Sequence, residues 1–414
     1  MDHPLSPSAT SDGDEVRARV PYAWTDREPL LELTFEIDEY RARLRRIQAA
    51  IGDAGLDGLL LYGGAASEAN VRYVTGFPSW WGDSLAMVPA TGDVTLITTA
   101  VFHGEPMHSN LQTTWVEDLR PLLNPQTTGS TVSLSGLAKD IVAEWGAQRG
   151  RLGLADTRII PARVDSELRA ALEPAAVEDA TSLLIELRAV KSAAEIEVLR
   201  ELGRIASTGM EAGLGAVQPG ARESDIAAAV NHAAMAAGAE RVPMGCFAIG
   251  GQRSFMKNVH ARHDKRIERD ELVSIDFAAV LGGYCSDMAR VTVAGTASAE
   301  LEDLMDTCLE AQEAGLAATA PGTPMKDVLA VMSDVVERRG WAEWDWTTSH
   351  GGGLELVEEP MFHRANARPL EAGMYFYIEP MIVPTHVGTI CIEDLVLVTD
   401  DGCERLTTTE RRTW

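Results

Sequence analysis

Acidic residues stand inside three apolar segments in the C-terminal half of this 414-residue sequence. Asp276 lies within LVSIDFAAV, Glu379 within MYFYIEPMIV and Glu393 within TICIEDLVLV. Each segment has the branched and aromatic residues that are typical of a buried β-strand. An ionised carboxylate in such surroundings costs several kcal/mol unless a cation compensates its charge. We therefore expect a fold that brings these strands together around positive charge.

A fourth acidic residue belongs to the same pattern. Asp287 follows Asp276 along the chain, and the pair Gly282-Gly283 lies between them. A glycine pair between two strands favours a tight hairpin turn, which returns the second strand alongside the first. The turn therefore predicts that the two aspartates lie close together.

Two sources of positive charge remain open for these four acids. Ion pairs are one source: Arg290 is near Asp287, and Asp394 would be the solvated member of its pair with Glu393. Buried ion-pair networks do account for acids of this kind. Two divalent cations are the other source, with one imidazole completing the ligand set. The strands contain few basic residues, which favours the metals, and an oxygen-rich site with one nitrogen suits Mn, Fe or Co and tolerates Zn.

Composition limits the class of protein and its partners. The length favours two domains. The formal net charge of −26, from 62 acidic and 36 basic residues, disfavours binding to nucleic acid or to an anionic membrane surface. There is no apolar run that would span a bilayer and no pattern of a signal peptide at the start. Five cysteines without a CxxC pair argue against disulfides and thiolate zinc sites, so we expect a cytoplasmic protein.

The order of predicted elements divides the chain into three parts. Residues 1–34 are rich in Pro, Ser, Asp and Glu and read as an N-terminal extension. Residues 35–181 alternate strands and helices, which indicates an α/β domain. Residues 182–414 begin with one long helical region that ends at Pro219-Gly220 and continue as an α+β domain, with helices expected near 298–316 and 324–339.

Four segments of the second domain resemble motifs of the creatinase/prolidase/methionine-aminopeptidase family, the M24-type metallohydrolases. They are IDFAAVLGGYCSDMARVTVAG, SHGGGLELVEEP, PLEAGMYFYIEPMIV and TICIEDLVLVTDDGCERLT. NVRYVTGF, residues 70–77, is similar to a signature of the creatinase-type N-terminal domain. The resemblance covers about residues 35–410 and implies a creatinase-like α/β domain followed by a pita-bread α+β catalytic domain, with assembly as a homodimer. It assigns five metal ligands: Asp276, Asp287, His350, Glu379 and Glu393.

The resemblance also implies a mechanism. Two divalent ions (Mn, Co, Fe or Zn) would activate a shared water for hydrolysis. Glu379 would act as ligand and as proton shuttle. His260, on the segment before the first aspartate strand, is similar to the family histidine that stabilises the tetrahedral intermediate, and His263 is its rival three positions on.

Two positions depart from the peptidase pattern. Val357 stands where peptidases of the family usually carry a second histidine, and Cys391 stands where prolidase-type members often carry an arginine. Both are substrate-side groups, so their loss predicts altered substrate recognition. His386 and Trp80 are further candidates for substrate binding, although such a histidine more often lies in a surface loop and such a tryptophan is more often simply packed.

We therefore expect a hydrolase of a C–N bond in a short peptide or small molecule, similar to Xaa-Pro peptidases but with changed recognition groups. A non-peptidase amidohydrolase resembling ectoine hydrolase is the near alternative. A metal-dependent lyase of the dimethylsulfoniopropionate-cleaving type is another. A non-catalytic binding protein fits less well, because such relatives generally lose metal ligands.

Overall fold

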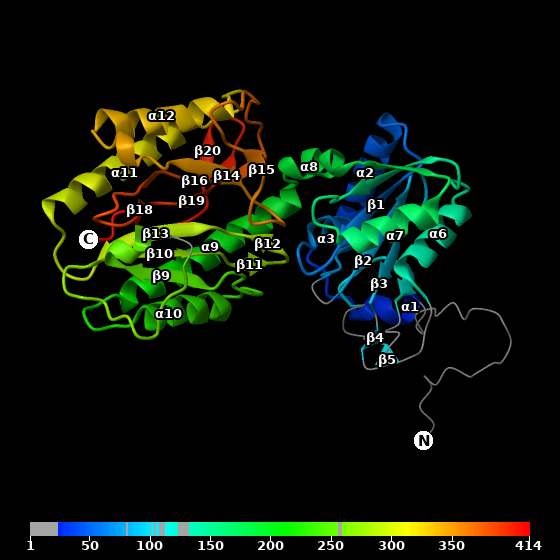
Figure 1. Ribbon diagram of the computed structural model, residues 1–414, viewed down its shortest axis with the longest axis horizontal. Helices are drawn as coiled ribbons and strands as arrows, with labels where there is room; N and C mark the ends of the chain where they lie inside the picture. Colours follow the sequence, from blue (N-terminus) through cyan, green and yellow to red (C-terminus); the bar gives the residue numbers. More distant parts are fainter. Residues whose placement is uncertain are drawn as a thin grey trace, which may run out of the picture. The chain divides into compact units, whose positions relative to one another are not determined.

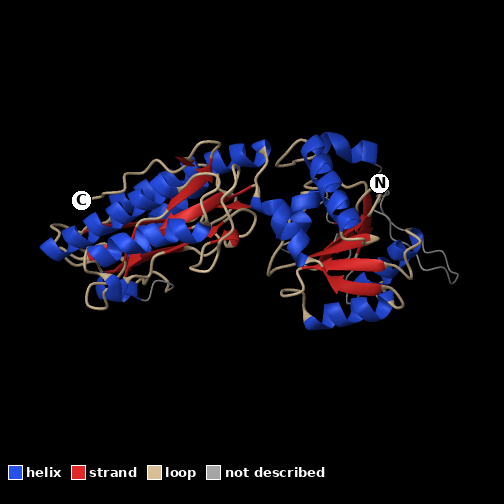
Figure 2. Ribbon diagram, turned by 90° about the horizontal axis from the view of Figure 1, so that it is seen from above, coloured by secondary structure: helices blue, strands red, loops and turns tan. Residues whose placement is uncertain are grey.

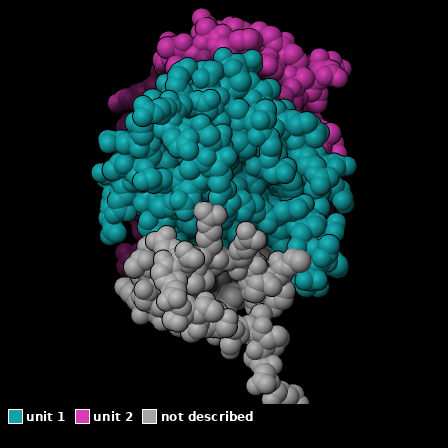
Figure 3. All heavy atoms as spheres, turned by 90° about the vertical axis from the view of Figure 1, so that its right-hand side faces the viewer, with its two compact units in different colours: residues 1–187 teal, residues 188–414 magenta. Residues whose placement is uncertain are grey.

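The chain forms two compact units, residues 1–187 and 188–414, which Figure 3 colours separately. The computed structural model describes residues 24–79, 82–99, 101–102, 105–106, 112–122, 132–255 and 259–414. We expected a boundary between 181 and 182. That point is the start of helix α8 (Thr181–Ala189), and the units divide within this helix.

The first unit is built on a six-stranded sheet in the order β6-β3-β2-β1-β7-β8. Strand β1 pairs antiparallel with β2 and parallel with β7. Helices pack on the strands and leave a core that is apolar throughout, and Figure 2 shows helices on both sides of these strands. This is the predicted α/β domain. The strands are β1 (Gly58–Gly63), β2 (Ser84–Pro89), β3 (Thr95–Thr98), β4 (Val101–Phe102), β5 (Glu105–Pro106), β6 (Asp118–Pro121), β7 (Arg151–Ala155) and β8 (Ala176–Asp179). The helices are α1 (Trp24–Arg27), η1 (Glu28–Leu30), α2 (Ile37–Asp53), α3 (Ala69–Thr75), α6 (Leu134–Glu144) and α7 (Ala162–Leu172).

Part of the predicted N-terminal extension is integrated into the first unit. The side chain of Arg27 is buried, and its guanidinium donates to the carbonyl oxygens of Thr114 at 3.0 Å and Val116 at 2.5 Å. The backbone N–H of Glu32 also donates to the carbonyl of Gln112 at 2.7 Å. Residues 24–34 therefore belong to the body of the unit, and residues 1–23 lie outside the described part of the chain.

The second unit layers helices over two sheets. The three-stranded sheet has the order β13-β10-β9, and the five-stranded sheet has the order β15-β14-β16-β19-β20. Figure 1 shows α11 and α12 over the five-stranded sheet and α10 beneath the three-stranded one. The helices are α9 (Ala193–Ala216), α10 (Glu223–Ala236), α11 (Ala299–Ala318), α12 (Met325–Arg338), η2 (Gly251–Phe255) and η3 (Ala342–Trp344). The strands are β9 (Cys246–Gly250), β10 (Leu272–Phe277), β11 (Val280–Leu281), β12 (Tyr284–Cys285), β13 (Met288–Val293), β14 (Thr348–Gly351), β15 (Glu358–Met361), β16 (Tyr375–Glu379), β17 (Met381–Ile382), β18 (Ile390–Cys391), β19 (Asp394–Val398) and β20 (Cys403–Arg405).

Close packing fixes the helices on these sheets. A Cβ atom at Gly315 of α11 would lie 2.6 Å from a methyl carbon of Ile378 on β16 and 2.7 Å from the sulfur of Met332 on α12. Interiors as dense as this leave little freedom for the strands to shift.

Among the described residues, no helix has both the length and the apolar character that crossing a membrane requires.

The long helical region predicted after residue 182 is interrupted. Helix α8 ends at Ala189, and α9 begins at Ala193 after the N-cap residue Ser192. The Ser192 hydroxyl accepts from the N–H of Glu195, and the Glu195 carboxylate accepts from the N–H of Ser192. This capping box satisfies donors that a helix start otherwise leaves open, so the predicted long helical region consists of two helices.

Candidate metal centre

The two aspartates lie on one hairpin. Strands β10 and β13 are antiparallel, with Asp276 opposite Ala289. The intervening turn uses Gly282 and Gly283, whose φ angles of 58° and 87° are in the left-handed region that glycine adopts without strain. Side chains alternate between the faces of a strand, so Asp287 shares the face of Ala289 and therefore of Asp276. Both carboxylates are buried.

His350 and Glu379 come from two paired strands of the five-stranded sheet. On β14 and β16, His350 lies opposite Tyr377, and Thr348 lies opposite Glu379. Alternation places His350, Tyr377 and Glu379 on the same face. The Nδ1 atom of His350 lies 3.1 Å from the carbonyl of Gly351. A carbonyl only accepts, so Nδ1 carries the proton and Nε2 presents its lone pair to the centre.

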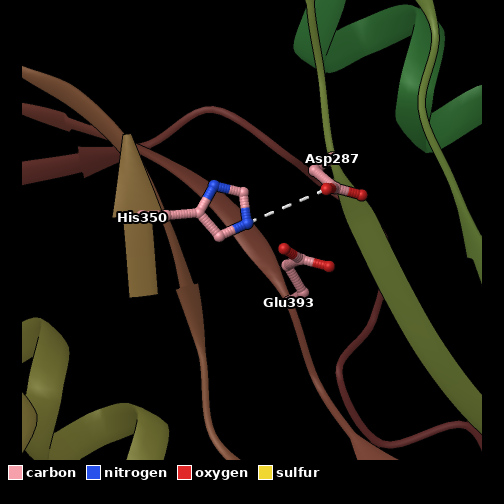
Figure 4. Close-up of side chains that lie close together, drawn as sticks. All are labelled: Asp287, His350 and Glu393. Carbon is pink, nitrogen blue, oxygen red and sulfur yellow. Dashed lines mark ion pairs between the residues drawn. The ribbon is translucent and has the colours of Figure 1, made fainter. Parts of the chain in front are cut away.

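Glu393 joins the two sheets between β18 and β19. Its backbone N–H donates to the carbonyl of Ala289 on β13 at 3.0 Å. Ligand atoms of Asp287, His350 and Glu393 lie within 4.8 Å of one another, and Figure 4 shows these side chains converging from separate segments of the chain. The Nε2 atom of His350 is 4.0 Å from an Asp287 oxygen.

A second group with the same spacing contains Asp276, Glu379 and Glu393. The two groups share Glu393, so the five predicted ligands form two adjacent groups, each of which could hold a cation. Four carboxylates and one neutral imidazole are a donor set that fits two divalent ions, because the carboxylates balance their charge and oxygen predominates.

The ion pair predicted between Arg290 and Asp287 and the solvated position predicted for Asp394 are both wrong. Arg290 is fully buried and donates to a carboxylate oxygen of Asp394 at 2.6 Å and to the carbonyl of Glu393 at 2.8 Å. Asp394 is also fully buried rather than solvated. Burial raises the pKa of Asp394, but Arg290 and Arg405 outweigh burial and hold it below its ordinary value. Arg290 is thus engaged by Asp394 on the opposite face of the strand from Asp287.

His260 is an exposed residue between η2 and β10. Its ring centroid is 5.9 Å from that of Phe247. Phe247 on β9 is directly opposite Asp276 on β10, and opposite residues share a face. Phe247 therefore connects His260 to the face that carries the first aspartate. The rival residue His263 is exposed as well.

The predicted substrate-side residues fall in different places. Cys391 is buried, and its sulfur lies 3.5 Å from a carboxylate oxygen of Glu379, which places it at the centre. Val357 is an exposed residue of the loop before β15. His386 does not join the cluster: its exposed ring pairs with Glu300 on α11 at 2.8 Å. Trp80 lies outside the described residues.

Two tyrosines of β16 also lie at the candidate site, and neither was predicted from the sequence. The Tyr377 hydroxyl donates to the carbonyl of Cys285 at 2.8 Å, and the Tyr375 hydroxyl donates to the same oxygen at 3.3 Å. The Tyr377 ring also lies edge-on to His350, with centroids 5.0 Å apart. The period-two pattern of YFYIE was the available signal, since it places Tyr377 on the face of Glu379.

Comparison with known proteins agrees with this architecture. The sequence profile of metallopeptidase family M24 matches residues 197–400, and that of the creatinase/prolidase N-terminal domain matches residues 43–190. An Xaa-Pro dipeptidase of Pyrococcus furiosus is 34% identical over 227 residues, which are 55% of this chain and 65% of that protein, slightly less than two-thirds of its length. An uncharacterized peptidase of Bacillus subtilis is 28% identical over 366 residues, covering 88% of this chain and 97% of the relative.

Solved structures show the same fold. An Xaa-Pro dipeptidase from Bacillus anthracis is 26% identical, with a TM-score of 0.78 over 90% of this chain and 99% of that one. The α/β domain followed by a pita-bread domain, predicted from the sequence, is confirmed. The two profile matches run through both units, and the chain belongs to metallopeptidase family M24, in its creatinase/prolidase branch.

Proposed function

We propose that this chain is a dinuclear metal-dependent hydrolase that cleaves a C–N bond in a short peptide or small amide. The observation that carries the proposal is the pair of three-residue groups that share Glu393. Asp287 and His350 would hold one ion, Asp276 and Glu379 would hold the other, and Glu393 would serve both. The donor set accepts Mn, Co, Fe or Zn.

The chain's own residues supply the proton chemistry. Divalent ions in such a centre lower the pKa of a water towards neutrality and polarise the scissile carbonyl. Glu379 would take the proton of the attacking water and deliver it to the departing nitrogen. His260 would donate a hydrogen bond to the oxygen that gains negative charge during attack.

Xaa-Pro dipeptides are the first substrates to expect, because two similar proteins are named Xaa-Pro dipeptidases. One observation favours a second candidate, a small-molecule amidohydrolase. Cys391 puts a thiol beside Glu379 at 3.5 Å, where a cationic side chain would attract a substrate carboxylate. A pocket without that charge suits a substrate that lacks a carboxylate at this position.

Metal content tests the centre directly. Purified protein reconstituted with Mn and analysed by elemental mass spectrometry should hold about two ions per chain. His350→Ala should retain about one, because it removes a ligand from a single group. His386→Ala is the matched control, since it deletes an exposed histidine that pairs with Glu300. Wild-type protein with well under one ion per chain would refute the proposal.

Substrate class is tested with the loaded protein. Xaa-Pro dipeptides, small amides and sulfonium zwitterions should be assayed side by side, and product analysis should separate hydrolysis from elimination. We expect hydrolysis of Xaa-Pro dipeptides and small amides only. Elimination from the sulfonium zwitterions without amide hydrolysis would overturn the proposed function. A homodimer, checked by analytical ultracentrifugation, and a cytoplasmic location are further predictions.

A further inference from the structure

Glu223 is a buried carboxylate that the proposed reaction does not use. It is the first residue of α10, and its side chain is fully buried. The carboxylate accepts from the N–H groups of Gly250 and Arg262, both at 2.9 Å, and from Arg253 at 2.8 and 3.3 Å. Charge-assisted bonds of this kind are strong and directional, so these groups are held in one arrangement.

The groups that Glu223 binds bracket the segment that carries His260. Gly250 ends β9 before that segment, and Arg262 follows His260 by two residues. Arg253 also donates to the carbonyl of His260 at 3.2 Å. One buried carboxylate therefore ties together the start of the segment, its end and the backbone of the histidine.

A second contact holds η2 against the segment that precedes β18. The hydroxyl of Ser254 accepts from the N–H of Thr389 at 2.9 Å, and the hydroxyl of Thr389 donates to the carbonyl of Ser254 at 2.5 Å. The backbone approaches closely here, because a Cβ atom at Gly388 would lie 2.6 Å from the carbonyl oxygen of Gly251, the first residue of η2. Thr389 immediately precedes β18, so η2 is fixed between α10 and the strand that leads to Glu393.

We propose that Glu223, acting through Arg253, is a positioning residue for His260. The inference rests on the role of His260 in the proposed function. The exposed imidazole lies against the ring of Phe247, and its location depends on the backbone to which it is attached. A reacting group misplaced by about 1 Å loses roughly a hundredfold in rate, which makes such an anchor consequential.

The kinetic test is a double-mutant cycle. Glu223→Gln should lower kcat about tenfold to a hundredfold with little change in KM. In a His260→Ala background the same substitution should leave kcat almost unchanged, since the imidazole that Glu223 positions is absent. Asp225→Asn is the matched control on the same helix, because Asp225 is exposed and pairs with Arg222 in solvent. Equal losses in both backgrounds would assign Glu223 a purely structural role and overturn the proposal.

Hydrogen exchange gives a readout that does not depend on activity. In Glu223→Gln the amides of residues 250–255 and 259–263 should exchange about tenfold faster or more, while β10 and β13 keep their protection and the metal content stays at the wild-type value. Unchanged exchange in the two segments would refute the anchor even if catalysis fell. If exchange is faster in Glu223→Gln but His260→Ala keeps full activity, the anchoring by Glu223 stands and the proposed role of His260 is contradicted. Should Glu223→Gln not fold, Arg253→Gln, at a partly exposed position, carries the same test.

Discussion

Tyr377 supports the candidate metal centre from outside the ligand set. Its ring contacts His350, and its hydroxyl donates to the carbonyl of Cys285, which lies two residues before Asp287. Burial raises the pKa of Tyr377 well above its ordinary value, so the hydroxyl remains a donor. One side chain thus contacts the candidate ligand His350 and the backbone that leads to the candidate ligand Asp287.

Tyr377→Phe should weaken metal binding by about tenfold, the lower end of the loss seen when a residue that orients a ligand is removed. It should also cost about 1–2 kcal/mol of unfolding free energy, because a buried carbonyl loses its shorter hydrogen bond. Tyr375→Phe is the matched control: it removes the longer bond to the same oxygen, at 3.3 Å. Chelator competition measures the affinity, and an equal effect of both substitutions would contradict this role of Tyr377.

At the level of single residues, the sequence indicated the acids but not their partners. Asp276, Glu379 and Glu393 stood out because charge inside an apolar strand needs compensation. Arg290 was assigned to Asp287 on sequence proximity, although alternation along β13 puts the two on opposite faces. The same alternation separates Glu393 from Asp394, which faces Arg290. The alternation of side chains along β13 therefore contradicts a pair between Arg290 and Asp287.

At the level of elements, a buried ion cluster holds the loop after β14. The carboxylate of Glu358 on β15 pairs with Arg188 of α8 and, at 2.8 Å, with Lys191. It also accepts from the N–H of Glu355 at 3.0 Å. Burial raises the pKa of Glu358, but the two cations outweigh burial and hold it below its ordinary value. The cluster joins the start of the second unit to the loop that follows His350.

The lowered pKa of Glu358 predicts a pH dependence. A carboxyl group with a lowered pKa in the folded state stabilises the fold above its unfolded pKa of about 4.3 and loses that contribution as the pH falls through the folded value. Glu358→Gln should cost about 3–5 kcal/mol at neutral pH, because two buried cations lose their counterion. Its unfolding free energy should then fall less steeply below about pH 4.

Urea denaturation at several pH values measures both effects. Glu371→Gln is the matched control, since Glu371 pairs with Arg368 in an exposed position. An acid dependence in Glu358→Gln as steep as in the wild type would contradict the assignment.

Helix boundaries show what periodicity alone misses. The apolar spacing around residue 190 continues through α8 and α9 and does not show where the first helix ends. The interruption is encoded in Ser192 and Glu195, a capping-box pattern that is readable in the sequence. Strand positions were predicted more successfully, because β10, β16 and β19 have apolar residues bounded by turns.

At the scale of the whole molecule, all five candidate ligands belong to the second unit. Ions that bind the folded state stabilise only the unit that holds them, by about 2.7 kcal/mol when their concentration is 100 times Kd. Removing metal should therefore lower the stability of residues 188–414 and leave residues 1–187 unchanged. Hydrogen exchange resolved by peptide distinguishes the units, and a uniform loss of protection across both would contradict this expectation.

The fold class was predictable because length, alternating elements and four family motifs agreed. The sequence could not place residues 24–34, because the buried Arg27 contacts backbone carbonyls near residue 115 that no local pattern reveals. The segment around His260 was equally hidden. Its anchor, Glu223, precedes the histidine by a helix and a strand, and a glutamate at a helix start is unremarkable on its own.

Both candidate ligand groups contain Glu393, and this has a consequence for the synthesis of the chain. The ribosome delivers the hairpin of Asp276 and Asp287 first, and Glu393 emerges only when the second unit is almost complete. Contacts between such distant segments form late in folding. A chain that stops before Glu393 lacks the residue that both candidate ligand groups share, so neither group can assemble early. Full loading with metal would then report that translation and folding of this unit have finished.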